Sequence, residues 1–275
     1  MQIDGKTQVV GIVADPITHV RTPQLFNALM VRQGVNAVCV PLHVSVLQLS
    51  QLLQGVAAAQ NLRGVVVTIP HKESVIGLCG ALTSSARLIG AANVLRWDRS
   101  QGHWLGGNLD GDGFVAGVKA HAHVLTGKRV LMVGAGGAGK AIAYAVAREN
   151  PAELVISNRS VARAEEVVDR VRSAVPEVAI RTGIANATGF DVVINATSLG
   201  LRDEDPSPLP VETLEVGTLV CEAVMRDTDT ALLEGARQRG CLIHEGLHML
   251  HGQLVEMAKF FGLSQKPTEL PLAGC

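Results

Sequence analysis

Several features that mark particular classes of protein are scarce in this sequence. Only 3% of the 275 residues are aromatic, so we expect no stacking surface for single-stranded nucleic acid. Lysine and arginine total 24 against 25 aspartates and glutamates, a formal net charge of −1. This balance argues against a dedicated nucleic-acid binder, whose affinity depends on excess positive charge. No apolar run reaches the roughly 20 residues that a membrane-spanning helix needs, so no membrane partner is expected.

Cysteine is also sparse, and its spacing is not that of a disulfide framework or a zinc site. The five cysteines form no CxxC pair, and their number is odd. Free thiols in a cytoplasmic protein fit this pattern best. The first residues also lack the basic start and apolar stretch of a signal peptide, which agrees with a cytoplasmic location. The cysteines are Cys39, Cys79, Cys221, Cys241 and Cys275.

The sequence is instead rich in apolar residues, arranged in an alternating pattern. Hydrophobic residues make up 47% of the chain and charged residues 18%, which excludes intrinsic disorder. The expected strands are 8–13, 36–41, 64–69, 92–97, 103–107, 129–133, 153–157, 177–182, 190–194 and 218–221. The expected helices are 23–34, 45–59, one beginning near His71, 137–149, 161–174, 229–239 and 247–262. Apolar strands alternating with helices predict an α/β fold with mostly parallel sheets.

A glycine-rich turn follows the strand at 129–133 and precedes a helix. Gly134 permits a tight turn, Gly136 leaves room for a pyrophosphate, and Gly139 lets the helix lie close to the strand. The helix N-terminus offers free N–H groups and partial positive charge to phosphates. Strand, glycine turn and helix in this order predict a dinucleotide site; the alternative is a merely structural turn.

The end of the next strand indicates which dinucleotide binds. An NAD-specific fold places an acidic residue there for the ribose 2′-hydroxyl, whereas this chain has Asn158 and Arg159, with Arg163 one turn later. A guanidinium can pair with a 2′-phosphate and stack on adenine, which favours NADP. The alternative is a solvated arginine, with Asn158 or Ser160 capping the helix.

Two ionisable residues stand near strand ends before the glycine turn. Lys72 follows the strand at 64–69, and Asp110 follows the strand at 103–107. A lysine held by a carboxylate can donate to a carbonyl oxygen that becomes an alkoxide during hydride transfer. The residues alone leave two other roles open: Lys72 as an ordinary first-turn residue, and Asp110 as the N-cap of a helix from about residue 112.

An ordered series of short motifs is similar to that of the shikimate dehydrogenase family over nearly the whole chain. The motifs are Asp15-Pro16-Ile17-Thr18-His19 with Thr22-Pro23, Val67-Thr68-Ile69-Pro70-His71-Lys72, Gly90-Ala91-Ala92-Asn93, Asn108-Leu109-Asp110-Gly111, Gly134-Ala135-Gly136-Gly137-Ala138, Asn158-Arg159-Ser160, Asn195-Ala196-Thr197-Ser198 and Gly246-Leu247-His248-Met249-Leu250 with Gln253. The resemblance implies a substrate domain over 1–107, completed by a C-terminal segment at 245–275. It also implies a Rossmann-type NADP domain over 108–244.

The resemblance also assigns roles to individual residues. It implies that Lys72 and Asp110 are the catalytic pair, and that Thr68, Asn93 and Gln253 contact substrate hydroxyls. The expected cofactor-binding residues are Gly134, Ala135, Gly136, Gly137, Ala138, Asn158, Arg159, Arg163, Thr197, Met225 and Gly246.

The chain departs from the family pattern where a substrate carboxylate is expected to bind. Two serines usual in the family align with Val20 and Thr22, so one hydroxyl donor is lost. Thr22 either contacts the substrate or only caps the helix that Pro23 opens, and Arg21 is either a carboxylate clamp or a solvated loop residue. Met225 replaces a usual tyrosine. The threonine resembles the quinate-using branch of the family.

The histidines are not expected to bind a metal. His244, His248 and His251 are close in sequence, but apart from Glu245 no carboxylate or cysteine completes an evident site, so we predict no bound metal. His121 and His123 are expected to face solvent.

Together these patterns predict an NADP-dependent oxidoreductase that interconverts shikimate and 3-dehydroshikimate, as a monomer or homodimer acting on a small hydroaromatic acid. One alternative is a dehydrogenase for quinate or another hydroaromatic acid with weak activity on shikimate. A second is an NADP-binding sensor without useful turnover, and a third is a structural module without a ligand.

Overall fold

The computed structural model describes residues 2–18, 20–226 and 228–263, so His19 and the end of the predicted C-terminal segment lie outside the described residues. The chain divides into two compact units. Within the described residues, unit 1 contains 2–109 and 254–263, and unit 2 contains 110–253. Helix α8 (Gly246–Phe260) therefore contributes residues to both units.

Unit 1 is built on a six-stranded mixed sheet in the order β2-β1-β3-β5-β6-β4. Parallel pairing joins β1 to β2 and β3, whereas β5 pairs antiparallel with β3 and β6. The strands are β1 (Gln8–Ala14), β2 (Ala37–His43), β3 (Leu62–Val67), β4 (Ala81–Leu82), β5 (Val94–Asp98) and β6 (His103–Gly107). The helices are α1 (Thr22–Gln33), α2 (Leu49–Ala57) and α3 (Ser84–Ile89), with short 3-10 helices η1 (Val46–Gln48) and η2 (Ser74–Leu78).

Both faces of this sheet are covered, which explains its nearly continuous apolar strands. Successive strand residues point to opposite faces. Val10 and Ile12 accordingly pack in a core with Phe26 of α1, and this core includes the last turns of α8. Val13 packs in a second core with Leu53 of α2. Polar residues therefore reach solvent mainly at the strand ends.

Several local expectations for unit 1 were wrong. No α-helix begins near His71; a turn leads into the five-residue η2. Helix α1 begins at Thr22 itself, and the N-cap position belongs to Arg21, whose side chain makes no capping hydrogen bond. Thr22 is therefore not the N-cap. The two-residue β4 and the six-residue α3 were not predicted, because such short elements carry too few residues for a period to show.

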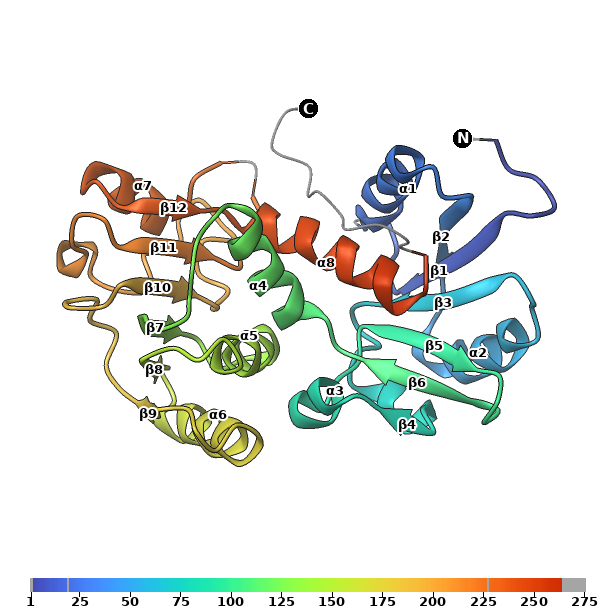
Figure 1. Ribbon diagram of the computed structural model, residues 1–275, viewed down its shortest axis with the longest axis horizontal. Helices are drawn as coiled ribbons and strands as arrows, with labels where there is room; N and C mark the ends of the chain where they lie inside the picture. Colours follow the sequence, from blue (N-terminus) through green and yellow to red (C-terminus); the bar gives the residue numbers. More distant parts are fainter. Residues whose placement is uncertain (1, 19, 227, 264–275) are drawn as a thin grey trace. The chain divides into compact units, whose positions relative to one another are not determined.

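Unit 2 contains a six-stranded, wholly parallel sheet in the order β12-β11-β10-β7-β8-β9. The strands are β7 (Arg129–Val133), β8 (Glu153–Ser157), β9 (Ile180–Thr182), β10 (Val192–Asn195), β11 (Leu219–Glu222) and β12 (Leu242–His244). The helices are α4 (Asp110–Ala120), α5 (Gly137–Ala147), α6 (Val161–Ala174) and α7 (Ala231–Gln238), with the 3-10 helix η3 (Val211–Thr213). In Figure 1, β12 and α7 lie at one end of this sheet, and β9 and α6 at the other.

This strand order is that of a Rossmann fold. The chain runs outward from β7 to β9, returns to the other side of β7, and continues outward from β10 to β12. The direction therefore switches between β7 and β10, and ligands of open α/β sheets bind outside the carboxyl ends of the strands at such a switch. The predicted α/β class is confirmed in both units.

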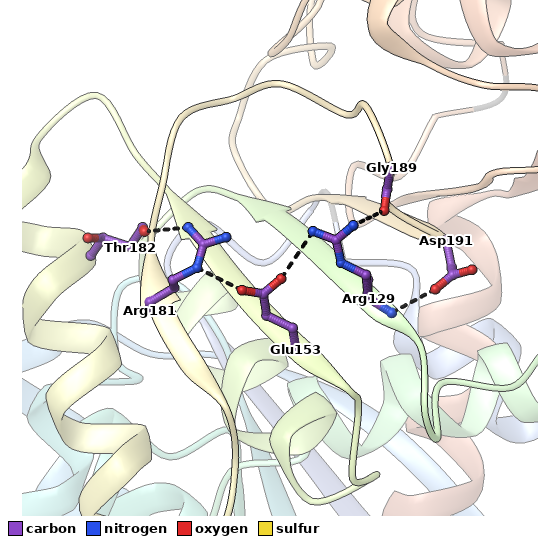
Figure 2. Close-up of polar contacts among 6 residues, drawn as sticks. All are labelled: Arg129, Glu153, Arg181, Thr182, Gly189 and Asp191. Carbon is purple, nitrogen blue, oxygen red and sulfur yellow. Dashed lines mark hydrogen bonds and ion pairs between the residues drawn. The ribbon is translucent and has the colours of Figure 1, made fainter.

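The opposite edge of this sheet, at the amino ends of the strands, holds a charged network (Figure 2). Glu153 accepts hydrogen bonds from Arg181 Nε at 2.7 Å and from Arg129 at 3.3 Å. Arg129 also donates to the Gly189 carbonyl and, through its backbone N–H, to Asp191. The Arg181 hydrogen bond, followed by the charges of both arginines, lowers the pKa of Glu153. This network ties together the beginnings of β7 and β8, the middle of β9 and the approach to β10.

The described cysteines Cys39, Cys79, Cys221 and Cys241 are free thiols, as expected. Among the described residues, no helix combines the length and apolarity needed to cross a membrane.

Candidate active site

In unit 1, the predicted proton donor Lys72 lies beyond the carboxyl end of β3. The segment before it is fixed by the fully buried His71, whose Nε2 donates to the Val44 carbonyl at 2.8 Å. The Lys72 carbonyl accepts the N–H of Ala92 at 2.8 Å. Thr68, where β3 ends, is bound through its N–H to the Val13 carbonyl. The backbone of the lysine is thus held from both sides, and its side chain is half-buried.

A second fixed point in unit 1 is Asn93, which is 1% exposed. Its Oδ1 accepts the N–H of Leu109 at 2.9 Å, and its own N–H donates to Gly107. Asn108 donates in turn to the Ala91 carbonyl. These bonds join the segment after α3 to the end of β6. Since Ala92 also binds Lys72, one backbone network holds the lysine and the residue that precedes Asp110.

In unit 2, Asp110 is the first residue of α4 and is 8% exposed. It lies within the helix, so the alternative in which it caps a helix from residue 112 was wrong. Gln253 Nε2 donates to Asp110 Oδ1 at 2.5 Å. A carboxylate at a helix N-terminus is stabilised by the partial positive charge there. Gln253 was expected only as a substrate contact; sequence reasoning missed its bond to Asp110.

Close packing of α4 against α8 makes this hydrogen bond geometrically possible. A Cβ on Gly113 would lie 2.7 Å from Gln253 Cβ, and one on Gly117 would lie 2.6 Å from the His248 carbonyl oxygen. Larger side chains would push the helices apart. The Gly-x-x-x-Gly spacing was the sequence signal that could have revealed this contact.

The glycine turn of unit 2 has the geometry that the sequence predicted for it. Gly134 has a φ of +117°, and a Cβ there would lie 2.6 Å from the Ala196 backbone. A Cβ on Gly139 would lie 2.4 Å from the Gly134 carbonyl oxygen. By contrast, a Cβ on Gly136, the N-cap of α5, or on Gly137 would meet no protein atom within 4 Å. Packing therefore does not explain why these two positions lack a side chain, and the space beside both is open.

The residues after β8 lie beside this turn. Asn158 Oδ1 accepts the N–H of Ala135 at 3.2 Å, and its Nδ2 donates to the Ser160 carbonyl. Arg159 is exposed and makes no side-chain hydrogen bond or ion pair with the described residues. Arg163 is exposed on α6. Asn158 thus has a structural function, while the guanidinium of Arg159 is available to a phosphate.

The loop after β10 is organised by a buried carboxylate. Thr197 donates to Asn195 Oδ1, and Asn195 Nδ2 donates to Glu222 at 2.9 Å. Glu222 also accepts from Thr230 at 2.7 Å and is fully buried. Burial raises the pKa of Glu222 to about 7, although these two hydrogen bonds oppose the shift. The Thr197 hydroxyl is therefore held by Asn195, which in turn binds the Glu222 carboxylate, whose pKa is about 7.

The other predicted positions differ in how much the structure explains. Gly246 allows a close approach, because a Cβ there would lie 2.0 Å from the Val224 carbonyl oxygen. Met225 is 52% exposed. In unit 1, Val20 packs against the core that contains α1, and Arg21 is exposed. The position of the lost serine hydroxyl thus belongs to the core and offers no donor.

The structure assembles a histidine cluster that the sequence did not predict. The rings of His121 and His248 stack with centroids 3.7 Å apart, and His244 lies 4.8 Å from His248. His123 lies 6.1 Å from His244. The expectation that His121 and His123 only face solvent was therefore wrong. Burial, followed by neighbouring histidines, lowers the pKa of His244 to about 3 and that of His248 to about 4.

Comparison with known proteins agrees with this architecture. Residues 12–95 match the shikimate dehydrogenase substrate binding domain, and residues 117–200 match the shikimate / quinate 5-dehydrogenase family. The shikimate dehydrogenase (NADP(+)) of Rubrobacter xylanophilus is 39% identical over 259 residues, which cover 93% of this chain and 90% of the relative.

Solved structures give the same result. Shikimate 5-dehydrogenase from Listeria monocytogenes, in complex with shikimate and NAD, is 28% identical with a TM-score of 0.87, covering 98% of this chain and 96% of its own. Ligand-free 5-ketofructose reductase of Gluconobacter sp. strain CHM43 is 28% identical with a TM-score of 0.85 and 94% coverage of both chains. This chain belongs to the shikimate dehydrogenase family.

Proposed function

We propose that the protein catalyses the NADP-dependent interconversion of shikimate and 3-dehydroshikimate, with Lys72 and Asp110 as the catalytic pair. The observation that carries this proposal is the network around Lys72. Ala92 fixes the lysine backbone, and the neighbouring Asn93 binds Leu109, the residue before Asp110. Lys72 and the residue that precedes Asp110 therefore share one hydrogen-bonded support in unit 1.

The chemistry of these side chains suits the interconversion of an alcohol and a ketone. Bound NADPH supplies the hydride for reduction of the ketone. Lys72 donates a hydrogen bond, and then its proton, to the carbonyl oxygen as negative charge develops there. Asp110 orients the ammonium, and Gln253 holds one oxygen of that carboxylate so that its orientation is set before substrate binds. In the oxidative direction, Lys72 accepts the hydroxyl proton.

The remaining predicted contacts form part of the same proposal. Thr68, Asn93 and Gln253 bind the substrate hydroxyls, and Thr22 and Arg21 bind its carboxylate. The glycine turn from Gly134 to Ala138 holds the pyrophosphate, which the open space at Gly136 supports. The proposed nicotinamide and adenosine contacts are Asn158, Arg159, Arg163, Thr197, Met225 and Gly246.

The carboxylate subsite supports a second candidate, a substrate other than shikimate. Val20 is partly buried, packs against the core that contains α1, and offers no donor to a carboxylate. Each hydrogen bond to a charged group is worth about 1.5–3 kcal/mol, so one lost donor weakens binding by about tenfold or more. The lost donor favours a ketone without a carboxylate, such as the 5-ketofructose named for the Gluconobacter structure, whereas quinate is favoured by Thr22, which resembles the quinate-using branch of the family.

Steady-state kinetics on shikimate, quinate and 5-ketofructose, each with the NADP and the NAD form of the cofactor, separate these candidates. The leading proposal expects the highest kcat/KM for shikimate with NADP. A higher value for another substrate supports the second candidate. Tight NADPH binding without turnover on any of the three supports a sensor instead.

Location and assembly are proposals as well. The free thiols of the described cysteines support a reducing, cytoplasmic compartment. A monomer or homodimer is proposed, and light scattering coupled to size-exclusion chromatography measures which form is present.

A further inference from the structure

Three histidines from separate elements of unit 2 meet at one place. His121 directly follows the last residue of α4, His244 ends β12, and His248 lies in the first turn of α8. Each offers one nitrogen, and these nitrogens all lie within 4.8 Å of one another. Ligands on a common divalent metal stand about 3–3.5 Å apart, given metal–nitrogen bonds of about 2.0–2.1 Å. The cluster is therefore close to the dimensions of a metal site.

Hydrogen bonds already orient two of the rings. His121 Nδ1 donates to the Gly117 carbonyl at 2.9 Å, which leaves Nε2 of that ring with its lone pair. A backbone carbonyl on the far nitrogen is the usual outer partner of a metal-bound histidine. His248 Nδ1 lies 3.4 Å from His244 Nδ1, so a single proton is shared between two nitrogens. A metal ion would replace that proton.

The surroundings also suit a cation. His244 is fully buried, so the Nδ1 that faces His248 is shielded from water. His121 follows the C-terminal end of α4, where the helix carries partial negative charge, and this offsets the partial positive charge at the start of α8 beside His248. His121 and His248 are half-buried, which gives an ion access from solvent. Glu245, the residue after His244, forms an ion pair with Arg237, so the positive charge of this arginine is compensated.

We propose that His121, His244 and His248 form a binding site for a divalent transition metal ion of the zinc type. Three imidazoles and a fourth position open to water or to His123 match the ligand preferences of Zn²⁺. Because the rings of His121 and His248 are stacked, the His248 ring rotates on binding, while His121 keeps its hydrogen bond to Gly117. The site does not contain the proposed catalytic residues; it fastens the beginning of α8 to the end of α4.

The sequence expectation of no metal rested on the lack of a carboxylate or cysteine, apart from Glu245, to complete a site with His244, His248 and His251. The fold supplies His121 instead, which is more than a hundred residues away in the chain. The spacing of the histidines along the sequence could not predict that His121 lies beside His244 and His248.

Co²⁺ is the appropriate probe, because its visible absorption reports coordination by nitrogen. Protein freed of metal by a chelator is titrated with Co²⁺, and then with Zn²⁺ by calorimetry. We expect one ion per chain, a visible band in the Co²⁺ form, and a higher melting temperature with Zn²⁺. The variants His121→Asn and His248→Gln, at half-buried positions, should each weaken binding by at least about tenfold.

His43→Asn is the matched control, since His43 is an exposed histidine of unit 1 that pairs with Asp15. It should bind Co²⁺ as the wild type does. Circular dichroism and NADPH binding verify that the variants fold. The proposal is overturned if the wild type binds no Co²⁺, or if both cluster variants bind it with unchanged affinity. Neither result depends on which substrate is turned over.

Discussion

Lys72 has a fixed backbone and a half-buried side chain, and its proposed role is proton donation, so its removal should slow the chemical step. We expect Lys72→Met to lower kcat by about 10²–10⁴-fold, the range for loss of a general acid. The dissociation constant for NADPH should stay unchanged, because the lysine belongs to unit 1 and the glycine turn to unit 2. Stopped-flow and fluorescence titration measure the two quantities. Glu73→Gln, at the exposed neighbouring position, is the control, and a wild-type kcat for Lys72→Met would refute the proposed role.

Arg159 has no partner among the described residues, so its guanidinium can pair with a phosphate without first breaking an ion pair. We expect Arg159→Ala to raise the KM for NADPH by about 10–100-fold, the equivalent of one charged hydrogen bond, and to leave the KM for NADH nearly unchanged. Arg170→Ala, which removes an exposed arginine paired with Glu166 on the same helix, provides the control. Equal losses for both cofactors would argue against a 2′-phosphate contact.

At this scale, sequence reasoning worked where a role depends on local backbone and failed where it depends on a distant partner. Gly134 and Gly139 were predictable, because strand, turn and helix follow one another in the chain. The bond from Gln253 to Asp110 joins residues 143 positions apart, and neither side chain signals the other. The assembly of His121 with His244 is unpredictable for the same reason.

At the scale of elements, the contact between α4 and α8 depends on glycines, which have no side chain to hold the helices apart. A Cβ on Gly117 would lie 2.6 Å from a backbone oxygen of α8, so the helices must move apart to admit it. We expect Gly117→Ala to lower the free energy of unfolding by about 1–2 kcal/mol, because overpacking outweighs the gain in helix propensity. Urea denaturation measures this.

Gly55 offers the matched control, since it lies in α2 and a Cβ there would meet nothing within 4 Å. Gly55→Ala should raise stability by about 0.5–1 kcal/mol. A gain in both variants would show that α4 and α8 are not tightly packed.

The network in Figure 2 lies at the amino ends of the strands, away from the glycine turn at their carboxyl ends. We expect Glu153→Gln to lower stability by about 1 kcal/mol at pH 7 without changing kcat or KM. Because the folded-state pKa of Glu153 is lowered, its contribution is present above the usual value of 4.5 and disappears as pH falls through the folded pKa. Urea denaturation at pH 7 and pH 3 checks both statements, and an altered KM would contradict the second.

Most long elements were predictable, because burial on two faces gives continuous apolar strands and burial on one gives a helical period. The strands β7 and β8 and the helix α6 have the predicted bounds. The segment after Pro70 was misassigned, because its turn is held by His71 binding Val44, a contact between distant parts of the chain.

At the scale of the whole molecule, stability should vary with pH through two buried groups. The folded-state pKa of Glu222 is raised to about 7, so its contribution is fully present below pH 4.5 and is lost as pH rises toward 7. That of His244 is lowered to about 3, so its contribution is present above pH 6.5 and is lost as pH falls. Between pH 4.5 and pH 6.5 the two effects oppose each other, because rising pH removes the contribution of Glu222 and restores that of His244.

The variant Glu222→Gln isolates the first effect. Its stability relative to the wild type should rise by about 3 kcal/mol between pH 4.5 and pH 7.5. The reason is that the pKa of Glu222 is about 7 in the folded protein and about 4.5 in the unfolded chain, and the glutamine does not titrate. The Thr230 hydroxyl can turn to accept from the new amide. Denaturation curves at several pH values measure the difference, and a constant difference would mean that Glu222 does not titrate in this range.

The chain passes between its two units at only two peptide bonds among the described residues, after Leu109 and after Gln253. The residues on the unit 2 side of these crossings, Asp110 and Gln253, are the pair joined by a hydrogen bond. Both crossings are therefore anchored at one place in unit 2, and a variant that removes this single hydrogen bond frees both of them together.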